Sequence, residues 1–167
     1  MPNIRHSLLI GASARKIYNA ITTQEGLSAW WTPGTHTIPE LNGIARFEFG
    51  EGYFKEMKIV ELKPFERVQW NCITGAEEWI GTTISFTLQA GDKDTLMQLH
   101  PEASDQIQQQ RPFDIATFLN FRHDNWKAYT PMFAECNYTW GRFLRSLKCF
   151  CETGSGRPWP NQHEVKP

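Results

Sequence analysis

The sequence has 167 residues and a mass of 19.3 kDa, a length that indicates one domain at roughly 100–200 residues per domain. Hydrophobic residues make up 40% and charged residues 21%, which argues against a disordered, collagen-like or membrane-spanning chain. The 17 basic and 18 acidic residues nearly cancel, so the chain lacks the positive field that nucleic-acid binding requires.

The chain is expected to begin with one strand and two short helices. An apolar run over residues 3–10 predicts the strand. Ser13 precedes apolar residues at three- and four-residue spacing, which predicts a capped helix over residues 14–21. A capping-box pattern that starts at Thr22 predicts a second helix, which extends to Trp31. Because no parallel strand follows directly, these helices are expected to cover the end of a sheet.

Four segments in the middle of the chain alternate between apolar and polar residues with a period of two, the pattern of half-buried strands. These segments are residues 45–49, 54–62, 68–72 and 84–88. Short turns join them, so we predict an antiparallel meander with one solvent-exposed face and one buried face.

The region between this meander and the end of the chain is harder to assign. Thr95–His100 and Ile115–His123 are candidate strands. The polar stretch Glu102–Arg111 between them is expected to be a loop or a short exposed helix. The segment near residues 96–117 therefore has the character of an insertion.

A long amphipathic helix is expected to cover the buried face of the sheet. Thr130-Pro131 provides a cap and a first-turn proline, and apolar residues recur at three- and four-residue steps over residues 132–151. Gly154-Ser155-Gly156 ends the helix. About 23 residues span about 34 Å, enough to cross a small sheet. The tail, residues 159–167, is expected to be flexible, although Trp159 has the character of a docking residue.

Several short motifs follow one another in an order typical of a known family. They are Ile17-Tyr18-Asn19-Ala20-Ile21, Ala29-Trp30-Trp31, Glu61-Leu62-Lys63-Pro64, Glu66-Arg67-Val68-Gln69-Trp70, Trp79 with Gly81 to Phe86, His123-Asp124-Asn125-Trp126, and the ending from Trp140 to Pro158. Their order over residues 3–158 resembles the START-like (SRPBCC) superfamily, in the branch named after the activator of heat shock protein 90 ATPase homologues. Asn125 replaces a glycine of the branch's signature, and the residues near 96–117 are additional.

The resemblance implies an α+β helix-grip fold, in which a curved antiparallel sheet wraps around the long C-terminal helix and leaves a cavity between them. It implies a single domain over residues 1–158. Physical reasoning agrees, because a twisted sheet cannot stay in contact along a straight helix of about 34 Å. An apolar cavity of this kind favours a lipid or another small hydrophobic molecule as the partner.

Most of the large aromatic rings are candidates for the wall of that cavity, and a histidine at the join between the last strand and the long helix could orient a ligand. The predicted ligand-binding residues are Trp30, Trp31, Phe47, Phe49, Trp70, Trp79, Phe86, His123, Trp126, Phe133 and Trp140. The competing interpretation is that each of them only packs the core.

No catalytic, metal or cofactor site is predicted. His123, His100, Asp124 and Glu78 are titratable groups that could face inward, but no pattern pairs them for acid–base catalysis. The five histidines lack the spacing of a metal site, and the four cysteines form no C-x-x-C pair. The phosphate- and dinucleotide-binding glycine motifs do not occur.

Three functional hypotheses remain open. The leading one is a non-enzymatic domain that binds a hydrophobic ligand. The second is an enzyme of the cyclase or aromatase kind that acts on a hydrophobic substrate in the same cavity, and the third is a chaperone ATPase cofactor. A homodimer through a sheet edge or the inserted segment is compatible with each of them. The short N-terminal apolar cluster, residues 8–10, does not match a secretory signal, so a cytoplasmic location is the expectation.

Overall fold

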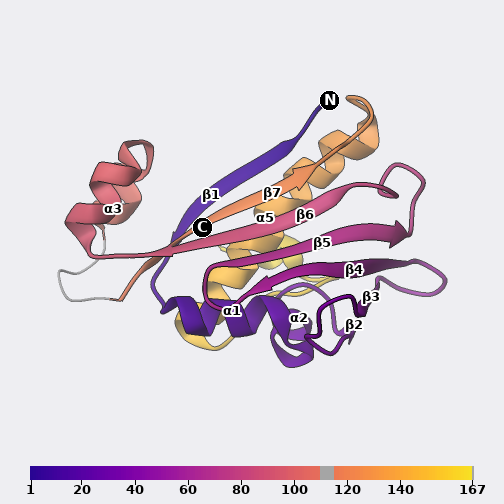
Figure 1. Cartoon of the computed structure of the whole chain (residues 1–167), viewed down its shortest axis with the longest axis horizontal. Helices are drawn as coiled ribbons and strands as arrows, with labels where there is room; N and C mark the ends of the chain where they lie inside the picture. Colours follow the sequence, from indigo (N-terminus) through magenta and orange to yellow (C-terminus); the bar gives the residue numbers. More distant parts are fainter. Residues whose placement is uncertain (110–114, 167) are drawn as a thin grey trace.

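A computed structural model describes residues 1–109 and 115–166, and its strands form one antiparallel sheet (Figure 1). Within the described residues the sheet has seven strands in the order β1-β7-β6-β5-β4-β3-β2. The strands are β1 (Ile4–Ile10), β2 (Gly34–His36), β3 (Ile44–Glu48), β4 (Phe54–Lys63), β5 (Arg67–Thr74), β6 (Thr83–Ala90) and β7 (Thr117–Asp124). The predicted meander is confirmed, and β2 is an addition that the sequence pattern did not indicate.

The two short helices lie beside one end of the sheet (Figure 1). In α1 (Ala14–Thr22), the Ser13 side chain accepts from the backbone N–H of Lys16, as predicted. The cap of α2 (Gln24–Trp30) is Thr23, which accepts from the backbone N–H of Gly26. The prediction of Thr22 as the cap was therefore wrong by one residue.

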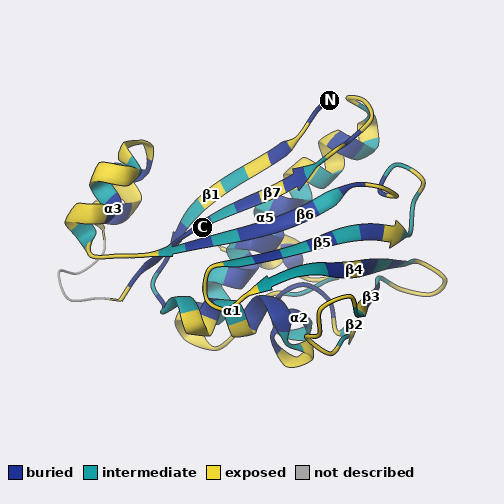
Figure 2. Cartoon of the chain, viewed as in Figure 1, coloured by how far each residue is buried: buried dark blue, intermediate teal, exposed yellow. Residues whose placement is uncertain are grey.

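The long helix α5 (Pro131–Thr153) lies against one face of the sheet (Figures 1 and 2). The Thr130 side chain accepts from the N–H of Phe133, and Gly154 ends the helix with a φ of 83°, in the left-handed region. The helix buries an apolar stripe that includes Trp140, Leu144 and Leu147. The predicted arrangement of a curved antiparallel sheet around a long C-terminal helix is confirmed.

None of the helices in the described part of the chain has the length and apolar character needed to cross a membrane.

The expected strand at Thr95–His100 was wrong, because this segment forms the helix α3 (Lys93–Leu99). Asp92 accepts from the N–H of Thr95 and caps it. A short 3-10 turn, η1 (Pro101–Ala103), and α4 (Ser104–Gln108) follow; residues 110–114 of the expected insertion lie outside the described residues. Apolar residues of this segment form a second small core with β1 and β7: Leu96, Ala103, Ile107, Leu9, Ala116 and Phe118.

The segment after α5 packs more closely than its composition predicts. The backbone N–H of Trp159 donates to the carbonyl of Trp31 over 2.8 Å. The N–H of Arg157 donates to Oγ of Ser146 over 2.7 Å. Gln162, in the 3-10 turn η2 (Gln162–Glu164), is buried. The chain therefore returns across the end of α2 after it leaves the long helix.

This return depends on the lack of a side chain at Gly156. A Cβ atom at this position would lie 2.4 Å from the carbonyl oxygen of Ala29 and 3.2 Å from Cα of Trp30. Because these are backbone atoms, they cannot move aside locally. We expect Gly156→Ala to lower the free energy of unfolding by about 1–3 kcal/mol, measured by urea denaturation.

Gly141→Ala is the matched control, since a Cβ atom there would meet only His6 at 3.7 Å. Within a helix, this change is expected to be neutral or to stabilise by up to about 1 kcal/mol. Equal stabilities for the two variants would contradict the proposed close approach at Gly156.

Candidate functional site

A cavity of about 260 Å³ lies between the sheet and the N-terminal half of α5. The sheet and its turns contribute aromatic rings and one lysine, α5 contributes both polar and apolar side chains, and the returning tail covers one side. The lining residues are Trp31, Phe49, Tyr53, Lys55, Trp79, Glu135, Cys136, Thr139, Trp140, Phe143, Trp159 and Gln162.

Four of the predicted ligand-binding residues lie in this wall: Trp31, Phe49, Trp79 and Trp140. Trp31 is central, because its ring centroid lies 5.1 Å from that of Trp140 and 5.6 Å from that of Phe49. Trp159 extends the wall, with its ring 6.1 Å from Phe49 in an edge contact. The structure therefore brings together rings from the cap that ends α2, from the sheet and its turns, from α5 and from the tail.

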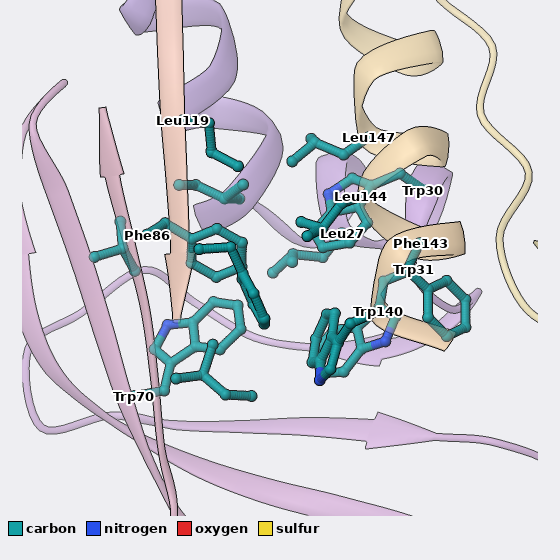
Figure 3. Close-up of a cluster of buried hydrophobic side chains, with 14 of the residues drawn as sticks. Leu27, Trp30, Trp31, Trp70, Phe86, Leu119, Trp140, Phe143, Leu144 and Leu147 are labelled. Atoms are coloured by element: carbon teal, nitrogen blue, oxygen red, sulfur yellow. The ribbon is translucent and has the colours of Figure 1, made fainter. Parts of the chain in front are cut away.

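The other predicted residues lie in the packed core, away from the cavity wall: Trp30, Phe47, Trp70, Phe86, His123, Trp126 and Phe133. Trp70 stacks on Trp31 with an interplanar angle of 9° and a centroid distance of 6.1 Å. The ring centroid of Phe47 lies 4.3 Å from that of Trp31 and 5.6 Å from that of Trp70. Figure 3 shows Trp70 and Phe86 on the sheet side of this cluster and Trp140 on the side of α5. Trp31 thus separates the solid core from the cavity.

His123 is fully buried and both of its ring nitrogens are occupied. The indole N–H of Trp140 donates to Nδ1 over 3.1 Å, so the ring carries its proton on Nε2, which lies 2.8 Å from Oγ1 of Thr82. That hydroxyl donates in turn to the carbonyl of Trp79 over 2.6 Å. Burial, followed by the charge of Lys55, lowers the pKa of His123 to about 3. The arrangement holds a neutral histidine.

Lys55 is the one lysine or arginine in the cavity wall among the described residues, its side chain is mostly buried, and sequence reasoning missed it. Its Nζ lies 4.1 Å from the ring centre of Trp79, 4.3 Å from that of Phe49 and 4.8 Å from that of Tyr53. We call these three rings the lysine cage. Burial lowers the pKa of Lys55 to about 8. At neutral pH the ammonium group is therefore still mostly charged.

The charge on Lys55 has no anionic partner in the described part of the chain, where its ammonium group makes no hydrogen bond or ion pair. Cys136 and Cys72 lie close enough to interact with it, but burial raises the pKa of both thiols, that of Cys72 to about 11. Both thiols are therefore neutral at pH 7. The exposed carboxylate of Glu135 accepts from the hydroxyl of Thr139 over 3.3 Å.

Gln162, a second polar residue of the cavity wall, has an incomplete set of hydrogen bonds. Oε1 of Gln162 is buried and has no hydrogen-bond partner among the described residues. The residue itself is 7% exposed and lines the cavity. Buried polar atoms are nearly always paired in folded proteins, so this unpaired oxygen is an exception.

A signal for Lys55 was present in the sequence. Along β4, Lys55, Met57 and Ile59 follow one another at every second residue, and all three are buried. A lysine in the inward series of a strand is unusual, because charged side chains are rarely buried without a partner. The pairing of β4 with β5 is irregular between Glu56 and Met57, and again between Ile59 and Glu61.

Comparison with known proteins agrees with this architecture. Residues 11–150 match the family model described as "Activator of Hsp90 ATPase homolog 1-like protein". Among curated proteins, none matches the sequence significantly.

Solved structures also resemble the chain. The Aha1 dimer from Colwellia psychrerythraea is 34% identical with a TM-score of 0.72, over 93% of this chain and 100% of that one. Two more distant structures share the fold. CalU16 from Micromonospora echinospora is 15% identical with a TM-score of 0.63, over 98% of this chain and 80% of its own. MLL2253 from Mesorhizobium loti is 12% identical with a TM-score of 0.65, over 88% of this chain and 94% of its own. The chain therefore belongs to the family of activator of Hsp90 ATPase homolog 1-like proteins.

Proposed function

We propose that this protein binds a small hydrophobic molecule in the cavity between the sheet and α5. The observation that carries the proposal is the cavity itself, about 260 Å³ in volume and lined mainly by aromatic rings. An apolar cavity of about 150 Å³ accepts a benzene molecule, so this one has room for a somewhat larger ring system. The wall is built by buried rings such as Trp31 and Trp140, which keep it open in the absence of a ligand.

The proposal predicts that a bulky side chain placed inside the cavity abolishes binding. Thr139 lines the cavity from α5 and makes only one side-chain hydrogen bond, to the exposed Glu135. With 2-naphthamide as a neutral aromatic probe, we expect Thr139→Phe to weaken binding at least about 10-fold by isothermal titration calorimetry, since ring and ligand compete for the same volume.

Ala134→Phe is the matched control, because Ala134 lies exposed on the same helix. This variant is expected to bind the probe like the original protein. Mass spectrometry of an organic extract of the purified protein would identify any molecule that occupies the cavity. Equal binding by both variants, or no binding of apolar probes by the original protein, would contradict the proposal.

A chaperone ATPase cofactor is the second candidate. It is supported by the name of the matched family and by the 34% identity to the Aha1 dimer over 93% of the chain. The same relative supports a homodimer as the assembly to test. The four free cysteines are compatible with a reducing compartment such as the cytoplasm. Stimulation of the ATPase of a purified Hsp90 would support this candidate, and no effect at excess protein would refute it.

A cyclase- or aromatase-like enzyme has the least support. The one buried histidine of the predicted site already uses both ring nitrogens, with Trp140 and Thr82. It therefore has no free nitrogen to offer a substrate.

A further inference from the structure

Burial disfavours the charged form of Lys55 and lowers its pKa. A charged group removed from water is destabilised unless an opposite charge or hydrogen bonds replace its hydration. The lysine cage of Trp79, Phe49 and Tyr53 supplies ring faces at 4.1–4.8 Å, which attract a cation but do not neutralise it. The structure therefore holds an uncompensated positive charge at the wall of an apolar cavity.

The surrounding groups do not provide the missing negative charge. The thiols of Cys72 and Cys136 are neutral at pH 7, because burial raises the pKa of each. Tyr53 and His123 are also neutral at this pH, since burial raises the pKa of the phenol and lowers that of the imidazole. Glu135 lines the same cavity from α5, but it is exposed to solvent and makes no ion pair with Lys55.

From this geometry we infer that the cavity takes a small aromatic acid, whose carboxylate pairs with the Lys55 ammonium group while its ring system lies among Trp31, Phe49 and Trp140. The inference rests on the proposed function and names the class of ligand for the same site. An ion pair inside a largely apolar wall would be short and charge-assisted, and so a strong contact.

The test compares two probes with the same ring system and nearly the same shape, the anion 2-naphthoate and the neutral 2-naphthamide, by isothermal titration calorimetry at pH 7. We expect the protein to bind the carboxylate about 10- to 100-fold more tightly than the amide, the range that a charge-assisted hydrogen bond supports. In Lys55→Met this preference for the carboxylate is expected to disappear. The affinity of the variant for the amide is expected to stay within about 3-fold of the affinity of the unaltered protein.

Lys58→Met is the matched control. Lys58 lies on the same strand but is exposed, so this variant should keep the preference for the carboxylate. Lys55→Met is also expected to raise the midpoint of thermal unfolding at pH 7, because it removes a charge that burial disfavours. A loss of carboxylate binding together with a gain in stability would separate a binding role of Lys55 from a purely structural one.

The possible failures are distinguishable. If the original protein binds both probes equally well, the role of Lys55 is refuted while the hydrophobic cavity stands. If neither probe binds, both the inference and the proposed function fail. If Lys55→Met does not fold, the comparison of the two probes on the original protein still decides the inference.

Discussion

Replacing Trp31 with alanine is expected to lower the free energy of unfolding by about 3–5 kcal/mol, the usual cost of deleting a large buried ring. Trp31 is 1% exposed and contacts rings on both sides, with centroids 4.3 Å away at Phe47 and 5.1 Å away at Trp140. Because it forms the boundary between the core and the cavity, its removal would extend the cavity into the core. The surrounding rigid rings cannot collapse to fill that space.

Urea denaturation at pH 7 measures this effect, and Tyr129→Ala is the control. Tyr129 is 83% exposed, so its removal should change the free energy of unfolding by less than about 0.5 kcal/mol. A loss below about 1 kcal/mol in Trp31→Ala would mean that the boundary ring is loosely packed.

Acidification is expected to destabilise the protein through His123. Its pKa is about 3 in the folded protein, whereas an exposed histidine in the unfolded chain has a pKa of about 6.5. Between these two values the unfolded chain binds a proton that the folded protein excludes. The stabilisation is therefore complete above pH 6.5 and decreases by about 1.4 kcal/mol per pH unit below it, until the pH approaches 3.

Urea denaturation at pH 7, 6 and 5 measures this slope above the range in which most carboxylates titrate. His123→Gln should reduce it, since a glutamine amide can accept from Trp140 and donate to Thr82 without titrating. His6→Gln is the matched control for a less buried histidine, whose pKa burial also lowers, and it should retain most of the slope. An unchanged slope in His123→Gln would show that other groups cause the acid sensitivity.

Local sequence patterns predicted most of the fold because the elements carry their own signals. Ser13, Thr130 and Gly154 mark helix ends that the structure confirms. The failure at Thr95–His100 has a physical reason. Asp92, just before this segment, is a residue type found both in turns and at helix caps, and here it caps α3. A short apolar segment cannot be assigned to strand or helix by periodicity alone.

The candidate site was less predictable, because alternation shows which face a side chain occupies but not whether that face is solid or hollow. Phe47 and Phe49 illustrate this, since the first packs the core and the second lines the cavity, although they share one face of the predicted strand. The difference depends on which residues of distant segments fill the adjoining space. Trp159 is such a residue, and the hydrogen bond from its backbone N–H to the carbonyl of Trp31 fixes its position.

The way the tail returns over α2 affects how relatives should be compared. The region that defines the family ends at residue 150, yet Trp159 and Gln162 form part of the cavity wall. If the proposed binding function is correct, two homologues with the same sheet and helices would therefore be able to select different ligands through the segment that follows α5.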